Sequence, residues 1–160
     1  MLDSIITEAI EQSVLCWLAT LSSDGFPNVS PKEAFTCDAN GRLLIAHIAS
    51  PQSIRNIQAN PNVCVSFVNI FTQKGYKIKG TATMLKPGHA DWESALGKLT
   101  DKIGTSYPIH GIISLRPKQT EPIIAPSYRL FPDTTETDRI ADSLQTYRVA
   151  DYQSRAIQGK

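Results

Sequence analysis

The sequence predicts a mainly β protein with short helices, arranged as a small antiparallel barrel. Apolar runs recur along the chain and are separated by turns in which glycine follows Asp or Asn, the pattern of β-hairpins. Strands and helices do not alternate as β-α-β units, so a doubly wound nucleotide-binding fold is disfavoured. Helical spacing of apolar residues is confined to short stretches beside or between the strands.

The first part of the chain is expected to hold a helix, two hairpins and a second helix. Asp3–Ser13 places apolar residues at helical spacing and has a capping residue at its start. The hairpins turn at Asp24-Gly25 and Asn40-Gly41, between strands expected over residues 14–22, 28–37 and 42–48. Ser50–Pro61 then predicts a short helix, because its Ser-Pro start suits an N-cap and the first helical position.

The rest of the chain is expected to complete the sheet and to end in a helix. Further strands are predicted over residues 63–69, 76–85, 111–115 and 123–130, which makes six or seven in all. Helices are predicted between Pro87 and Gly104 and over Asp133–Val149. The sequence thus indicates one domain over residues 1–150, followed by a polar and loose C-terminal tail over residues 151–160.

Composition and charge exclude several classes of protein. The 160 residues suffice for one domain with its own core. Sixteen Lys and Arg against fifteen Asp and Glu argue against a nucleic-acid partner bound through a basic face and against a polybasic membrane anchor. Charged residues make up only 19% of the chain, below the ~25% that is usual. We therefore expect a second subunit or a cofactor to cover part of the surface.

Neither a membrane segment nor a metal site is expected from the sequence. The longest apolar run, Val14–Ala19, is far shorter than a membrane span, and the first residues are acidic where a signal peptide is basic. Three widely spaced cysteines without a CxxC pair indicate reduced thiols, with no disulfide framework and no zinc site. These features predict a cytoplasmic protein with no membrane partner.

The junction between the strand at 42–48 and the following helix is the strongest candidate binding site. A helix N-terminus presents free N–H groups and a partial positive charge, which together suit a phosphate group. Side-chain donors at this end are Ser50, Gln52 and Ser53, with Arg55 in the next turn. The alternative is that Ser50 only caps the helix and nothing binds. Spacing alone favours that alternative.

Lysines on the predicted strands are a second candidate. Lys77 and Lys79 share one strand face, and Lys32 lies in another strand. They can surround an anion or form the solvated face of an antiparallel sheet, and composition favours the solvated face. His47 stands at a strand end, where packing is the commoner role. The other two histidines lack metal-ligand spacing, and no P-loop, GxGxxG or G-x-S-x-G motif occurs, so no catalytic residue is identified.

Three segments together resemble the pyridoxamine 5'-phosphate oxidase-like, FMN-binding split-barrel family, and most of all its short bacterial members. They are ATLSSDGFPNVSPKEAF, LLIAHIASPQSIRNIQANPNVCVSF and KGYKIKGTATML. The ordered set, above all S-x-x-S-x-R-N-I-x-x-N-P followed by V-x-V-S-F, is more specific than any one motif. The resemblance implies a six-stranded antiparallel split β-barrel with flanking helices. It also implies a homodimer that holds FMN between its subunits.

The resemblance implies cofactor-binding roles for twelve residues. The phosphate group maps to the strand–helix junction, at Ser50, Gln52, Ser53 and Arg55. The flavin ring maps to two strands, at Ser30, Pro31, Lys32, Ala46 and His47. From the partner chain, the residues implied to approach the flavin are Lys74, Gly75 and Lys77.

The chain departs from the vitamin B6 oxidase at positions that matter for its reaction. Ser30 replaces an arginine, Gln52-Ser53 replaces an Arg-Lys pair, and no C-terminal segment matches the one that grips the substrate. Oxidation of pyridoxine phosphate is therefore not expected. The first hypothesis is an FMN-dependent oxidoreductase that passes hydride or electrons between a reduced donor and an unknown small molecule. The alternatives are a non-catalytic flavin-binding or stress-related protein, and a haem-binding split barrel with His47 or His110 as axial ligand.

Overall fold

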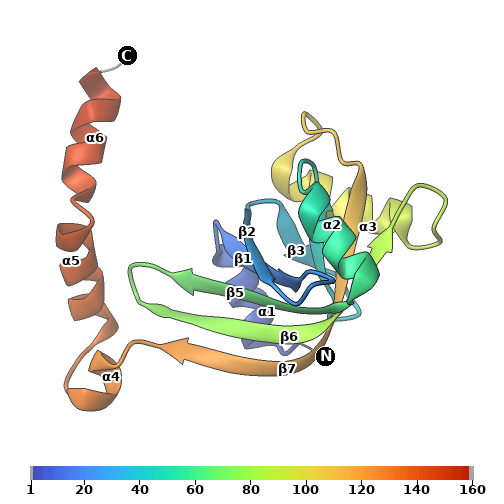
Figure 1. The fold of residues 1–160 in the computed structure, drawn as a ribbon. Coiled ribbons are helices and arrows are strands. Elements are labelled where there is room, and N and C mark those ends of the chain that lie inside the picture. Colours follow the sequence, from blue (N-terminus) through green and yellow to red (C-terminus); the bar gives the residue numbers. More distant parts are fainter. Residues whose placement is uncertain (1, 159–160) are drawn as a thin grey trace. The chain divides into compact units, whose positions relative to one another are not determined.

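The chain folds into one antiparallel, curled seven-stranded sheet with helices at its flanks (Figure 1), as a computed structural model describes it for residues 2–158. The strand order is β2-β1-β5-β6-β7-β4-β3. This confirms the predicted fold class, with seven strands where the family resemblance implies six. The elements are α1 (Ser4–Gln12), β1 (Cys16–Leu21), β2 (Pro27–Lys32), β3 (Phe35–Cys37), β4 (Leu43–His47), α2 (Pro51–Ala59), β5 (Asn62–Asn69), β6 (Lys74–Leu85), α3 (Trp92–Ile103), β7 (Gly111–Ile124), α4 (Ser127–Leu130), α5 (Glu136–Thr146) and α6 (Val149–Gln158).

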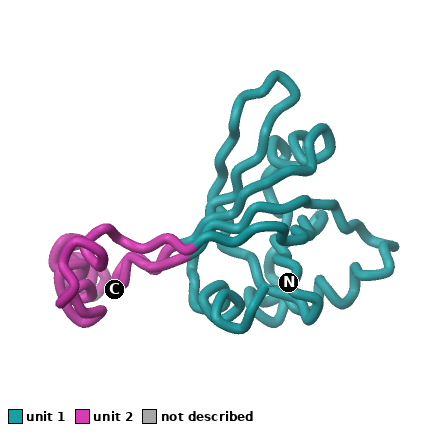
Figure 2. The backbone as a smooth tube through the Cα atoms, turned by 90° about the horizontal axis from the view of Figure 1, so that it is seen from below, with its two compact units in different colours: residues 1–67, 76–121 teal, residues 68–75, 122–160 magenta. Residues whose placement is uncertain are grey.

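Contacts within the chain define two compact units (Figure 2). The first holds residues 1–67 and 76–121, and the second holds residues 68–75 and 122–160. The expectation of one domain over residues 1–150 stays a prediction. Within residues 2–158, no helix combines the length and the apolar character needed to cross a bilayer.

The core of the first unit has two hydrophobic clusters, which meet at β4. Leu43 and Ile45 belong to the larger cluster, whereas Leu44 and Ala46 belong to the smaller one, which packs against α3. Because both faces of β4 are covered, the strand is a continuous apolar run rather than an alternating one. β4 is therefore a rigid element, and it ends at His47.

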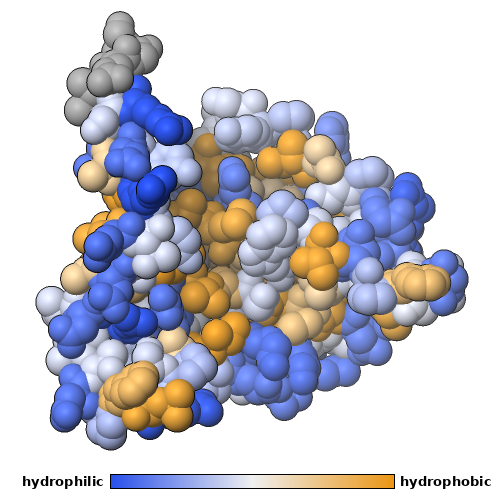
Figure 3. All heavy atoms as spheres, turned by 60° about the vertical axis from the view of Figure 1, so that its left-hand side comes forward, coloured by the Kyte–Doolittle hydropathy of each residue, from blue (hydrophilic) through white to orange (hydrophobic). Residues whose placement is uncertain are grey.

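The second unit is held by contacts between the β5–β6 turn and the C-terminal helices. The Ser143 hydroxyl donates to the carbonyl oxygen of Phe71 at 3.0 Å, and the Tyr128 hydroxyl donates to the carbonyl oxygen of Thr72 at 2.8 Å. A capping box between Thr135 and Asp138 begins α5. Hydrophilic side chains cover most of the face of α5 and α6 that Figure 3 shows.

The structure corrects three expected elements. The strand predicted over residues 28–37 is divided: β2 pairs with β1, and β3 pairs with β4. The strand predicted over residues 111–115 continues to residue 124 as β7, because pairing with neighbouring strands extends it through a polar stretch that shows no alternation. Of the strand predicted over residues 123–130, only the first two residues belong to β7, and residues 127–130 form α4 instead. The tail predicted to be loose over residues 151–160 is helical through Gln158, because α6 spans Val149–Gln158, and residues 159 and 160 lie outside the described residues.

Candidate functional site

A buried lysine without an acidic partner marks the candidate site. Lys32, the last residue of β2, is only 7% exposed. Its Nζ donates to the hydroxyls of Ser30 and Ser50, each at 2.7 Å, and to the Pro31 carbonyl oxygen at 3.2 Å. All three acceptors are neutral, and no carboxylate among residues 2–158 pairs with the ammonium. Burial lowers the pKa of Lys32 because the charged form loses water contacts.

Three serines connect this lysine to the first turn of α2. The Ser30 hydroxyl lies 3.1 Å from the hydroxyl of Ser53, which is 1% exposed. Ser50 occupies the N-cap position, as the sequence predicts, but its side chain makes no capping hydrogen bond. Its hydroxyl accepts from Lys32 instead. The helix therefore begins beside a buried cation, and both features favour an anion at this place.

His47 lies next to this cluster, at the end of β4. Its Nδ1 accepts a hydrogen bond from the backbone N–H of Ser50 at 3.3 Å. Burial, together with the nearby His110 and Lys32, lowers the pKa of His47 and so favours the neutral imidazole. The two histidine rings lie edge to face, with centroids 6.3 Å apart.

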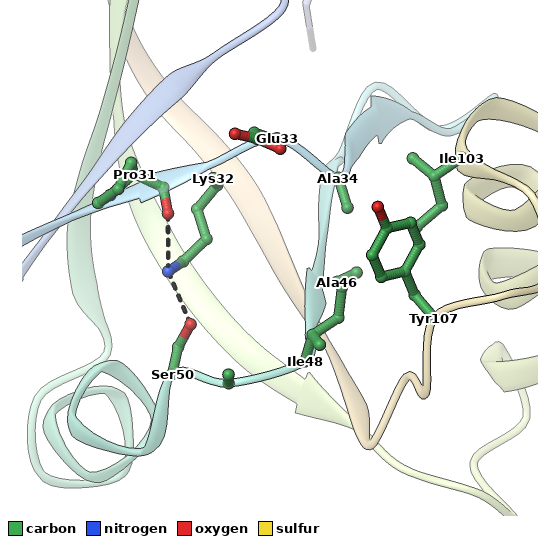
Figure 4. A pocket seen from close by; sticks show the side chains of 10 residues that line it. Pro31, Lys32, Glu33, Ala34, Ala46, Ile48, Ser50, Ile103 and Tyr107 are labelled. Atoms are coloured by element: carbon green, nitrogen blue, oxygen red, sulfur yellow. Dashed lines mark hydrogen bonds between the residues drawn. The ribbon is translucent and has the colours of Figure 1, made fainter.

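A cavity of about 450 Å³ adjoins the lysine (Figure 4). Lys32 and Ser50 lie on one side of it, and Ile103 and Tyr107 lie on the other. Ile103 ends α3, and Tyr107 belongs to the loop that follows. The volume falls within the ~300–1,000 Å³ of small-molecule sites. An apolar wall beside a cationic end suits a ligand with a flat apolar part and an anionic group.

The structure brings together seven of the twelve residues singled out from the sequence. Pro31, Lys32, Ala46 and Ser50 line the cavity. Ser30, Ser53 and His47 join them through the hydrogen bonds given above. The lining residues that sequence reasoning missed are Glu33, Ala34, Ile48, Ala49, Ile103 and Tyr107. The first four are neighbours of predicted residues, whereas nothing in the local sequence relates Ile103 and Tyr107 to the site.

The other five predicted residues make contacts elsewhere. Gln52 and Arg55 bond to each other on the exposed side of α2, at 2.6 Å. Lys77 pairs with Glu121 at 2.6 Å. In the second unit, Lys74 pairs with Glu136 at 2.5 Å, and its neighbour Gly75 is buried.

The solvated-face interpretation of the three lysines is correct for two and wrong for one. Lys77 and Lys79 share an exposed strand face, and both pair with Glu121. Lys32 instead points inward beside Cys16 and Leu18, because β2 is separate from β3. Within residues 2–158, no group of three or more His, Cys, Asp and Glu side chains is placed to hold a metal ion.

Comparison with protein families gives a match over residues 2–137 to a family model described as pyridoxamine 5'-phosphate oxidase. A pyridoxine/pyridoxamine 5'-phosphate oxidase of Rhodopseudomonas palustris is 36% identical over 74 residues, which are 46% of this chain and 34% of the relative. An uncharacterized protein of Methanocaldococcus jannaschii is 36% identical over 93 residues, 54% of this chain and 62% of the relative. The matches thus span about a third and somewhat under two thirds of these relatives.

Several solved structures share the fold. HupZ of Group A Streptococcus has a TM-score of 0.64 and 21% identity, with 75% of this chain and 92% of that chain covered. An FMN-binding protein of Syntrophomonas wolfei has a TM-score of 0.63 and 9% identity, with 75% and 84% covered. HutZ, the heme storage protein of Vibrio cholerae, has a TM-score of 0.60 and 23% identity, with 77% and 94% covered. At these identities the likeness concerns the fold alone.

Proposed function

Because the chain belongs to the pyridoxamine 5'-phosphate oxidase family, we propose that it binds FMN, with the phosphate at Lys32 and the flavin ring in the adjoining cavity. The observation that carries this proposal is the buried ammonium of Lys32, which is bonded only to neutral oxygens. A buried charge is costly unless an opposite charge compensates it. A phosphate would supply that charge.

The phosphate would take its contacts from a small set of groups. Lys32 supplies the charge, Ser50 and Ser53 supply hydroxyls, and the first turn of α2 supplies backbone N–H groups. Gln52 and Arg55 bond to each other on the exposed side of α2 and do not line the cavity. One fixed cation therefore dominates the electrostatics of the site.

We propose that the protein acts as a homodimer. Trp17 and Val29 lie on the outward face of β1 and β2, 46% and 57% exposed. Such an apolar sheet face favours a partner that covers it. Since Lys77 pairs with Glu121 and does not line the cavity of its own chain, we propose that Lys74, Gly75 and Lys77 approach the flavin of the second copy.

We further propose an FMN-dependent oxidoreductase that acts on a small molecule. Bound FMN supplies hydride and electron transfer, while the protein binds, orients and shields it. Besides Lys32, the titratable side chains that line the cavity are Glu33 and Tyr107. A non-catalytic flavin-binding protein would have the same site without turnover.

Titration of the purified protein with FMN tests the proposal. We expect quenching of flavin fluorescence that saturates at one FMN per chain, and then FMN-dependent oxidation of NADH or NADPH with an added acceptor. Saturable binding without turnover would favour the non-catalytic flavin-binding protein. Absence of any quenching would overturn the proposal.

Haem is the second candidate ligand, and the pair formed by His47 and His110 is the observation that favours it. The solved structure of a heme storage protein with this fold points the same way. Titration with haemin distinguishes the candidates, since a haem site would give a Soret band that shifts in His47→Ala or His110→Ala. The buried cation at Lys32 would pair with an anionic group of either ligand, the phosphate of FMN or a propionate of haem, so the two titrations decide between them.

FMN affinity is expected to fall at alkaline pH through Lys32. Its pKa in the free protein lies below the ordinary 10.5, and a bound phosphate would raise it again. Between these two pKa values binding takes up a proton, so affinity decreases as the pH rises; at lower pH Lys32 is charged in both states and contributes no slope. Dissociation constants measured across this range for the wild type and Lys32→Met give the test. The ratio of the wild-type dissociation constant to that of Lys32→Met cancels the titration of the flavin itself. This ratio is expected to rise with pH, and a constant ratio would contradict the prediction.

A further inference from the structure

We infer that His47 is a positioning residue: its Nδ1 holds the backbone N–H of Ser50 and thereby places the Ser50 hydroxyl against Lys32 at the phosphate site. The inference rests on the proposed function, because it gives His47 a part in that same site. It differs from the role that the family resemblance implies, in which His47 lies along the flavin ring.

The backbone of His47 is fixed by the sheet. His47 pairs with Gly111 of β7, and its carbonyl oxygen accepts from the backbone N–H of His110 at 2.9 Å. Only Ile48 and Ala49 separate it from Ser50, where the chain turns into α2. The imidazole thus reaches from the end of β4 to Ser50, the last residue of the connection between β4 and α2.

The Ser50 position needs such a contact because ordinary capping does not set it. Its φ and ψ are −130° and 56°, outside the extended region usual for an N-cap, and its hydroxyl accepts no bond from the first turn of α2. Its carbonyl oxygen accepts the first hydrogen bond of α2, from the backbone N–H of Ile54 at 3.3 Å. Its other hydrogen bonds go to His47 through the backbone N–H, at 3.3 Å, and to Lys32 through the hydroxyl, at 2.7 Å. Loss of the contact with His47 would free the hydroxyl that accepts from Lys32.

The contact requires neutral His47 with its proton on Nε2, because only a free lone pair on Nδ1 accepts a hydrogen bond. The charged or titratable groups that face the imidazole are Lys32 from β2 and His110 from the β7 side. Both oppose a positive charge on His47. The imidazole therefore serves the site as an acceptor and not as a second cation.

Two variants separate this role from packing. His47→Leu fills a similar volume with an apolar side chain and removes the acceptor Nδ1. His47→Asn loses volume but places an amide oxygen near the position of Nδ1, on the same branch from Cγ. A packing role predicts that leucine is the better replacement, whereas the positioning role predicts that asparagine is.

The experiment measures dissociation constants for FMN and for riboflavin, which lacks the phosphate. We expect His47→Leu to weaken FMN binding about tenfold and to leave riboflavin binding within about twofold of wild type. We expect His47→Asn to restore the FMN constant to within about threefold. His89→Leu is the matched control, since His89 Nδ1 accepts the backbone N–H of Asp91 at 3.1 Å, just before α3 and away from the cavity lining.

The outcomes are distinguishable. Equal losses for FMN and riboflavin in His47→Leu, or no loss for either, would overturn the inference. FMN binding in His47→Asn that is as weak as in His47→Leu would also overturn it.

If the wild type shows no preference for FMN over riboflavin, the proposed function fails together with the inference. If Lys32→Met abolishes that preference and His47→Leu keeps it, only the inference fails. If the leucine variant does not fold, His47→Gln takes its place. The amide of glutamine lies one carbon further from the backbone than that of asparagine, so this variant is expected to bind FMN as weakly as His47→Leu.

Discussion

Replacement of Lys32 by methionine is expected to weaken FMN binding about 100-fold and to stabilise the free protein. Hydrogen bonds to charged groups contribute about 1.5–3 kcal/mol each, and a 100-fold change corresponds to about 2.7 kcal/mol. In the free protein, however, Lys32 is only 7% exposed, and its ammonium donates only to neutral oxygens. Methionine has a similar length and carries no charge, so the free energy of unfolding is expected to rise by about 1 kcal/mol.

Urea unfolding and fluorescence titration measure the two effects on one preparation. Lys79→Met is the control, because Lys79 is an exposed lysine that pairs with Glu121 at 3.0 Å, away from the cavity lining. We expect the control to change neither quantity beyond about 0.5 kcal/mol. Wild-type FMN affinity in Lys32→Met would remove the phosphate from this position. A loss of stability would show that the buried charge is compensated in a way that its hydrogen bonds do not reveal.

The opposite signs of these effects follow from the place of Lys32 in the sheet, which the sequence alone misassigns. Phe35 belongs to the core, so uninterrupted alternation through residues 28–37 would put Val29 and Pro31 inside and Lys32 outside. The chain breaks between β2 and β3 at Glu33 and Ala34, and this break shifts the alternation. As a result both Lys32 and Phe35 point inward. No residue type at positions 33 and 34 signals such a break.

Local patterns predicted the part of the site that is local. The Ser-Pro start of α2 fixed the helix boundary, and with it the position of Ser50 and Ser53. The apolar run of β4 fixed the position of Ala46 and His47. The far wall of the cavity depends on tertiary packing, because Ile103 and Tyr107 reach it only when α3 covers the second cluster of the core. The spacing of apolar residues predicts the helix, but it does not indicate that these two side chains reach the cavity.

The largest loss of stability is expected at Gly80, where β6 lies directly against the backbone of β7. A Cβ at Gly80 of β6 would lie 2.1 Å from the carbonyl oxygen of Arg116 and 3.1 Å from the Cα of Pro117, both in β7. Backbone atoms cannot move aside as a flexible side chain can, so the strands would have to separate. We expect Gly80→Ala to lower the free energy of unfolding by about 3 kcal/mol, the upper range for overpacking.

Gly97→Ala is the matched control for Gly80→Ala, because the same Cβ placed at Gly97 within α3 meets no atom within 4 Å. Alanine is the better helix former, so this variant is expected to be more stable than wild type by up to about 1 kcal/mol.

β7 also pairs with β4, which ends at His47, so separation of β6 from β7 would disturb the strand that holds the site. Gly80→Ala is therefore expected to lose FMN binding and riboflavin binding together in urea, each in proportion to the fraction of the variant that is unfolded. Lys32→Met is expected to lose FMN binding alone, and to do so while it is fully folded. Wild-type stability in Gly80→Ala would mean that β6 and β7 lie further apart at this position.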